Sequence, residues 1–248
     1  MKPLIADVHT HSIVSGHAFG TVREMAAAAA ERNLKILGVT EHGPGTPGTC
    51  DPIYFWNFFD APRNLYGVEM LYGCEINVLP GGKLSLEEQY IKHLDYAVVG
   101  IHAACYHDQG IRANTDNLIA CMQHEKVRFV SHPDDDRFPL DYPALVQAAK
   151  ERNVGLEVNN SSLRKAYLRP GSRENYGKML PLCAELGVNI LINSDAHDPN
   201  WVGNFHLARK LVEEVGFPDA YIVNNDAEKL KAFLGIKNQD ALDMSGIL

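Results

Sequence analysis

Residues 5–11 read IADVHTH and residues 36–42 read ILGVTEH, so each is a short apolar run that ends in histidine. Similar runs with polar ends recur at 71–77 (LYGCEIN), 96–102 (YAVVGIH), 129–132 (FVSH) and 190–197 (ILINSDAH). Because segments of helical period separate them, the runs predict parallel strands joined by crossover helices. Polar residues at the ends of such strands predict a functional site.

Seven strands are expected, together with a weaker eighth. They are placed near residues 4–9, 36–41, 70–76, 96–101, 128–131, 155–159 and 189–193, with the weaker candidate at 220–223. A doubly wound sheet would gather ligands from only two or three strands. Here every strand except the sixth carries candidates, and only a closed barrel brings six strand ends to one place. We therefore expect a single α/β domain over 1–248, with a loosely attached tail after about residue 235.

Helix-capping patterns lie between several of the strands. The expected caps are Thr21 with Glu24, Ser85 with Glu88, Thr115 or Asp116, and Asp141. The first two are capping boxes, in which the hydroxyl and the carboxylate each bond to the other residue's backbone N–H. The segment 172–186 also reads as a helix, although Pro181 should kink or split it.

Composition is ordinary for a globular protein, with 46% hydrophobic and 22% charged residues in a chain of 248. No apolar run approaches the length of a membrane span, and the N-terminus lacks the zones of a signal peptide, so we expect a cytoplasmic protein. Five cysteines without a CxxC pair favour reduced thiols. A net charge of −8 disfavours a stable nucleic-acid partner.

The candidate ligands are seven histidines, one glutamate and one aspartate. They are His9, His11, His17, His42, Glu75, His102, His132, Asp195 and His197. Residues two apart on a strand leave the same face, so each HxH or DxH pair can reach one ion. One such pair alone is weak evidence for a metal, but nine donors at strand ends predict metal binding.

The donor set favours Zn over other divalent metals, with Mn or Fe as alternatives. Nitrogen and carboxylate ligands without cysteine argue against a thiolate site and against an all-oxygen Mg or Ca site. Nine ligands are too many for one or two tetrahedral ions with open positions, so three ions fit better. The cofactors expected are therefore three divalent metal ions.

The motifs DVHTHS, TEH, SHP and SDAH, with His17, Glu75 and His102, resemble those of the PHP family, named for polymerase and histidinol phosphatase domains. The resemblance covers nearly the whole chain and is strongest to the YcdX-like bacterial phosphatases. It implies a distorted seven-stranded (β/α)7 TIM-like barrel with a trinuclear centre.

The resemblance also implies how the ligands divide among the ions. One ion would bind His9, His11, Glu75 and Asp195, a second His17, His42 and His197, and a third Glu75, His102 and His132. Glu75 would thus bridge two ions, and Glu75 and Asp195 are expected to act in catalysis. Asp7, two residues before His9, is a further candidate that could orient an imidazole or accept a proton.

Such a centre suits phosphate ester hydrolysis, because a hydroxide shared between ions can attack phosphorus in line. We expect a metal-dependent phosphatase acting on a small phosphomonoester. Alternatives are a histidinol phosphatase, a nucleic-acid-end phosphoesterase and a metal-binding regulatory module without turnover. A homo-oligomer is left open. Arg164, Lys165 and Arg169 could hold an anionic substrate, but solvated loop cations are the preferred interpretation.

Overall fold

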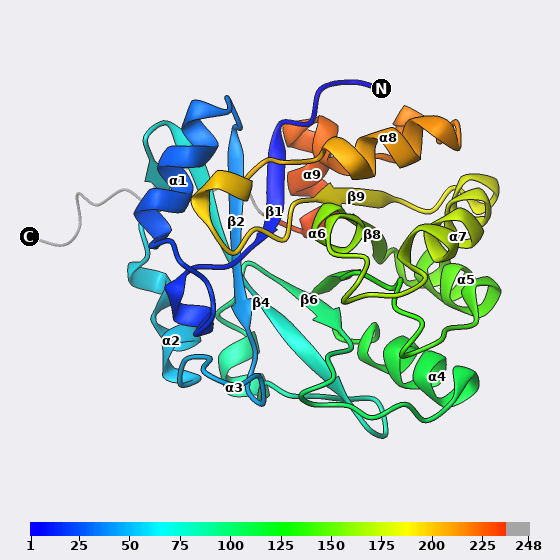
Figure 1. Cartoon of the computed structure of the whole chain (residues 1–248). Helices are drawn as coiled ribbons and strands as arrows, with labels where there is room; N and C mark the ends of the chain where they lie inside the picture. The colour runs from blue at the N-terminus through cyan, green and yellow to red at the C-terminus, as the bar shows by residue number, and fades with distance from the viewer. Residues whose placement is uncertain (237–248) are drawn as a thin grey trace, which may run out of the picture.

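A computed structural model describes residues 1–236, in which the strands form a nearly closed barrel surrounded by helices (Figure 1). The barrel strands are β1 (Ala6–Thr10), β2 (Ile36–His42), β4 (Val68–Leu79), β6 (Tyr96–Gly100), β7 (Val127–Val130), β8 (Gly155–Asn159) and β9 (Ile190–Asn193). They pair in that order, each parallel to the next. The expected seven-stranded α/β barrel is confirmed. The predicted loose tail falls almost wholly on residues outside the described range.

The seam between the first and last strands closes with few bonds. Thr10 forms an isolated parallel bridge with Ala196, whose carbonyl accepts from His11 N at 2.8 Å. Nearby, Val8 N donates to the side chain of Asn193 at 3.1 Å. By contrast, β8 and β9 pair in continuous register from Leu156 to Asn159. The seam brings the HTH and DAH segments, far apart in sequence, side by side.

Helices follow most of the strands and cover the outer face of the barrel (Figure 1). They are α1 (Val22–Glu31), α2 (Ile53–Trp56), α3 (Glu88–Ile91), α4 (Ile111–Cys121), α5 (Tyr142–Arg152), α6 (Asn160–Arg164), α7 (Ser172–Leu186), α8 (His206–Glu214) and α9 (Ala227–Leu234). None of the helices within residues 1–236 is long and apolar enough to cross a membrane. All five cysteines are free, as expected.

The prediction of an eighth strand at 220–223 is wrong. Two 3-10 turns occupy this region, η4 (Asp219–Tyr221) and η5 (Val223–Asn225), and a single bridge joins Ile222 to β9. The side chain of Asn224 holds the segment instead, because its Nδ2 donates to the carbonyls of both Ala6 and Ile192. A side chain that bonds to two strands replaces the ladder that a further strand would need. Two short strands that the sequence did not predict, β3 (Asn64–Leu65) and β5 (Lys83–Leu84), pair antiparallel with β4.

The helix caps were predicted with mixed success. Thr21 accepts from Glu24 N at 3.2 Å and Thr21 N donates to Glu24 at 2.7 Å, so the first capping box is confirmed. Ser85 does not cap α3, because its hydroxyl accepts instead from Asn77 N at 3.1 Å. The predicted cap at Thr115 or Asp116 is also wrong, since α4 begins at Ile111 and contains both residues, and the Thr115 hydroxyl donates to Ile111 O.

The two remaining helix predictions concern α5 and α7. Asp141 caps α5 as expected, accepting from Ala144 N at 3.1 Å. The helix α7 runs unbroken through Pro181, so the predicted split is absent. Buried residues on both sides of the proline, Met179 and Cys183 among them, pack α7 onto the barrel and offset the missing hydrogen bond.

A separate apolar core fills the barrel near the amino ends of its strands. Val8, Tyr96 and Phe129 pack there with Phe233 of α9, so this helix covers that end. The Tyr96 hydroxyl donates to Val8 O at 2.7 Å. A Cβ at Gly38 of β2 would overlap this hydroxyl, which explains why glycine occupies the position. With one end filled, the carboxyl ends of the strands remain for the site.

Candidate metal centre

Glu75 of β4 lies at the middle of the candidate site and is fully buried. Five histidines surround it, with Oε2 3.4 Å from His9 Nε2, 3.5 Å from His11 Nε2 and 3.0 Å from His42 Nδ1, and Oε1 3.3 Å from His102 Nε2 and 2.8 Å from His132 Nε2. The Ser131 hydroxyl also donates to Oε1 at 2.7 Å. One carboxylate therefore meets five imidazoles from four different strands or their ends.

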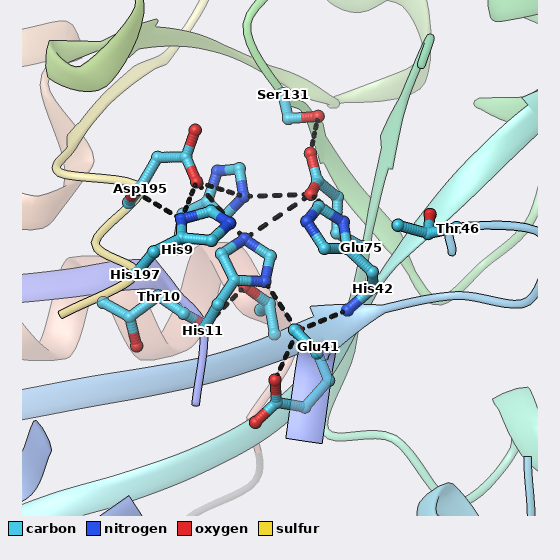
Figure 2. A network of polar contacts seen from close by, with 12 residues as sticks. His9, Thr10, His11, Glu41, His42, Thr46, Glu75, Ser131, Asp195 and His197 are labelled. Atoms are coloured by element: carbon cyan, nitrogen blue, oxygen red, sulfur yellow. Dashed lines mark hydrogen bonds and ion pairs between the residues drawn. The ribbon is translucent and has the colours of Figure 1, made fainter. Parts of the chain in front are cut away.

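Asp195, just beyond β9, is the second buried carboxylate of the site. Its Oδ1 lies 3.3 Å from His11 Nε2, 3.8 Å from His9 Nε2 and 3.5 Å from His197 Nδ1. Figure 2 shows contacts from Asp195 and from Glu75 converging on the same imidazoles. Asp195 has a φ of 51° and His132 a φ of 31°. Such left-handed backbone is uncommon outside glycine and recurs at functional sites.

Three histidines, His17, His42 and His197, meet beside the two carboxylates. His197 Nε2 lies 3.1 Å from His17 Nε2, and the ring centroids of His17 and His42 are 4.9 Å apart. All nine predicted ligands thus come together at one end of the barrel. Three groups have ligand atoms close enough to share a cation: His9 with His11 and Asp195, His11 with His42 and His197, and His42 with Glu75 and His102. The predicted division of ligands among three ions differs in part from these groups and stays a prediction.

The residues present fit divalent metal ions. Within residues 1–236, five buried atoms that face the centre have no hydrogen-bond partner: His9 Nε2, His11 Nε2, His42 Nδ1, Glu75 Oε2 and His102 Nε2. A buried polar atom without a partner is costly, and here the unpartnered atoms all belong to metal-binding groups. Cations placed among them would satisfy all of these atoms at once.

The protonation states of most ligands also suit a cation. Burial, followed by the neighbouring His42 and His197, holds the pKa of His11 well below its usual range. Burial likewise lowers the pKa of His102 to about 4 and that of His197 to about 4. These imidazoles are therefore neutral at pH 7, which is the form that binds metal.

At Glu75, Asp195 and His9, neighbouring charged groups outweigh burial in setting the pKa. Burial acts to raise the pKa of Glu75, but the imidazoles of His102 and His9 outweigh it and hold that pKa well below its usual range. The pKa of Asp195 is lowered in the same way, by His9 foremost. Burial lowers the pKa of His9, yet Glu157 and Glu75 outweigh it and hold the value well above its usual range. A metal ion bound at His9 must displace that proton.

Sequence reasoning missed two carboxylates behind the ligands. Glu157 of β8 lies with Oε1 2.8 Å from His9 Nδ1, and its Oε2 accepts from His132 N at 2.9 Å. The sixth strand, expected to contribute no ligand, therefore supports two of them. Glu41 is also buried and accepts from the hydroxyl of Ser15, which in turn lies 3.1 Å from His11 Nδ1. Their position in the sequence could have indicated them, since Glu41 and Glu157 each precede a polar strand end by one or two residues.

Asp7 does not share the face of His9, contrary to expectation. Its carboxylate accepts from Ser194 N at 3.1 Å and from Gly203 N at 2.8 Å, and within the described residues it makes no hydrogen bond to an imidazole. The register of β1 shifts between Asp7 and Thr10, so simple alternation fails there. Burial raises the pKa of Asp7 to about 6, against these hydrogen bonds. Its position anchors the segment that carries Asp195.

The preferred interpretation, that the cations following β8 are simply solvated, is wrong for Arg164 and Arg169. The Arg164 guanidinium lies 3.8 Å from the centroid of the Trp201 ring. Arg169, whose side chain is 18% exposed, places Nη1 2.7 Å from His132 Nδ1. Arg169 therefore contacts a candidate ligand directly.

Comparison with known proteins identifies the family. The sequence profile described as the PHP domain matches residues 7–161. The chain belongs to the PHP domain family. Curated PHP relatives include a probable phosphatase of Clostridium novyi, 38% identical over 95% of this chain and 96% of its own length. Another, from Clostridium acetobutylicum, is 38% identical over 96% of this chain and 97% of its own length. This agreement confirms the predicted resemblance and the predicted enzyme class, a phosphatase.

Solved structures support the PHP fold. A histidinol phosphate phosphatase from Lactococcus lactis, solved with zinc, L-histidinol and phosphate, has a TM-score of 0.59 at 18% identity and covers 86% of this chain and 94% of its own. A chain in the structure of an archaeal ribonuclease P with mature tRNA has a TM-score of 0.60 at 14% identity, with 92% and 90% coverage. At such low identity, these likenesses concern the fold alone.

Proposed function

We propose that this protein hydrolyses a small phosphomonoester with three divalent metal ions, zinc by preference, held at the carboxyl ends of the barrel strands. The observation that carries the proposal is the set of unpartnered nitrogen and oxygen atoms around Glu75. Nine ligands on so many strand ends exceed what one ion can use. Nitrogen and carboxylate donors favour zinc, with manganese or iron as alternatives.

The residues divide the chemical work in a simple way. When bound, the ions supply positive charge beside the phosphate oxygens and lower the pKa of water towards neutrality. Glu75 and Asp195 bring negative charge that holds the cations together, and Glu157 fixes the ring of His9 through Nδ1. Asp7 supports the site indirectly, because its carboxylate accepts a hydrogen bond from Ser194 N, next to Asp195.

Substrate choice follows from charge and from the fold. A formal charge of −8 opposes long nucleic acids, whereas cationic side chains such as Arg169 beside His132 favour a compact anion. Since a PHP fold of known structure binds L-histidinol and phosphate, histidinol phosphate belongs in any substrate panel. Nucleotides belong there too, as representatives of the nucleic-acid-end alternative.

Metal analysis and a generic aryl phosphate assay on the purified full chain test the proposal. We expect about three bound ions and hydrolysis that a chelator abolishes and zinc or manganese restores. Bound ions without hydrolysis under any metal would favour the regulatory metal-binding alternative.

Glu75→Gln tests the central carboxylate. Because Glu75 contacts five imidazoles, we expect the variant to lose metal and activity together. The exposed Glu125→Gln, which removes the same charge from the surface, is the matched control. Full metal content and a normal rate in Glu75→Gln would refute the role given to this residue.

A further inference from the structure

Three candidate ligands have one ring nitrogen held by a hydrogen-bond acceptor. His9 Nδ1 lies 2.8 Å from Glu157 Oε1, His102 Nδ1 lies 2.7 Å from Asn77 Oδ1, and His197 Nδ1 lies 3.1 Å from Asp195 O. An acceptor requires the hydrogen on that nitrogen, so the other nitrogen is the one whose lone pair can bind a cation, in His9 after the loss of its second proton. These three rings are therefore set to bind a cation through Nε2.

His132 is arranged in the opposite way. Its Nδ1 lies 2.7 Å from Arg169 Nη1, and a guanidinium has hydrogens to donate but no lone pair with which to accept. Nδ1 must then accept, so the hydrogen sits on Nε2, which is 2.8 Å from Glu75 Oε1 and donates to it. Both nitrogens of His132 are occupied in this arrangement, and neither is free for a cation.

A second partner for Arg169 lies close by. Asp134 is fully buried, and neither oxygen of its carboxylate has a hydrogen-bond partner among residues 1–236. Asp134 Oδ1 lies 3.9 Å from the same Arg169 Nη1. A move of roughly 1 Å would turn this contact into a charge-assisted hydrogen bond. Since an unpaired buried charge is costly, Asp134 favours that move.

We propose that Arg169 competes with a metal ion for His132 and moves to Asp134 when the ion binds. A cation at His132 Nε2 forces the hydrogen onto Nδ1, where it faces the donor Nη1 and repels it. Arg169 thereby lowers the affinity of the metal position that uses His132, and Asp134 receives the displaced guanidinium. This inference rests on the proposed metal dependence and adds a positioning role for Arg169 and Asp134.

Metal titration of the metal-free full chain tests the competition. Zinc affinities are measured against a chromophoric chelator for wild type, Arg169→Met and Arg164→Met. The second variant removes one positive charge five residues earlier, at the end of α6, where the guanidinium stacks on Trp201 and, among residues 1–236, forms no hydrogen bond or ion pair with a candidate ligand. Because a competitor reduces the fraction of sites able to bind, we expect the weakest zinc site to tighten about tenfold in Arg169→Met but not in Arg164→Met. Equal titrations of the two variants would overturn the competition.

Nitrogen NMR of labelled histidine gives a readout that a merely structural role would not change. In the metal-free wild type, His132 should carry its hydrogen on Nε2, and zinc should transfer it to Nδ1. In Arg169→Met, Glu75 still accepts from Nε2, but Nδ1 loses its donor, so the Nδ1 resonance of the metal-free ring should shift while the hydrogen stays on Nε2. A wild-type His132 that already carries the hydrogen on Nδ1 without metal contradicts the inference. If the wild type nevertheless binds zinc and hydrolyses aryl phosphate, the proposed function stands and only the competition is refuted. If it neither binds zinc nor hydrolyses aryl phosphate, the proposed function is refuted as well.

Discussion

Individual histidines at the centre depend on the groups behind them. His9 touches both central carboxylates through Nε2, yet it is Glu157 at Nδ1 that fixes which nitrogen has the lone pair. Sequence patterns located His9 because an HTH at the end of an apolar run is distinctive. They could not locate Glu157, because a single glutamate in a strand looks the same whether it holds a ligand or lies in a salt bridge.

Glu157→Gln tests this support. The amide oxygen can still accept from His9 but without a negative charge, so the ring becomes a weaker ligand. We expect metal affinity to fall by about 10–100-fold, as is typical when such a partner is lost. Competition with a chelator measures the effect, and the exposed Glu151→Gln on α5 is the control. Unchanged affinity in Glu157→Gln would show that His9 is oriented without this carboxylate.

At the level of elements, most strand bounds were predicted closely, whereas the helix starts were predicted with mixed success. A strand is marked by several apolar residues, so β2 and β8 fall within one residue of their predicted ends. A cap depends on one side chain, which another partner can capture. Ser85 is the example, since the backbone of Asn77 takes its hydroxyl, and the Asn77 amide oxygen in turn holds His102. The local capping pattern fails there because the Ser85 hydroxyl accepts from a residue that supports the site.

The contact between β2 and β6 inside the barrel provides an element-scale prediction. Gly38→Ala would push a methyl group against the Tyr96 hydroxyl and the backbone of Val8. We expect a loss of about 1–3 kcal/mol in the free energy of unfolding, as in other overpacked cores. Denaturant unfolding of Gly38→Ala, Tyr96→Phe and the double variant measures it. Removing the hydroxyl should relieve part of the overlap, so strictly additive losses would contradict this interpretation.

For the molecule as a whole, the centre lies across the barrel seam. His9 lies on β1 and His11 just beyond it, while Asp195 and His197 follow β9. An isolated backbone bridge joins Thr10, at the end of β1, to Ala196, beyond the end of β9. Six ligand-bearing strands in the sequence already required closure of the barrel. The small number of backbone bonds across the seam could not be predicted, because apolar runs mark the strands but not which backbone atoms pair.

Removal of metal should therefore weaken the whole fold. We expect a chelator to lower the Tm, because like charges and unpartnered nitrogens remain at the seam, and added zinc to raise the Tm with concentration. Thermal unfolding followed by circular dichroism measures both shifts. Glu75→Gln, lacking the shared carboxylate, should show little response to zinc. An identical Tm with and without chelator would mean that the seam closes unaided.

The seam also bears on how the protein emerges from the ribosome. Val8 and Asn193 are 185 positions apart, yet they bond directly beside the centre. A nascent chain therefore exposes the HTH segment long before its counterpart, Asp195 and His197, has been synthesised. Under the proposed metal dependence, tight binding of the ions therefore requires that translation has passed His197, so metal is acquired late in the synthesis of the chain.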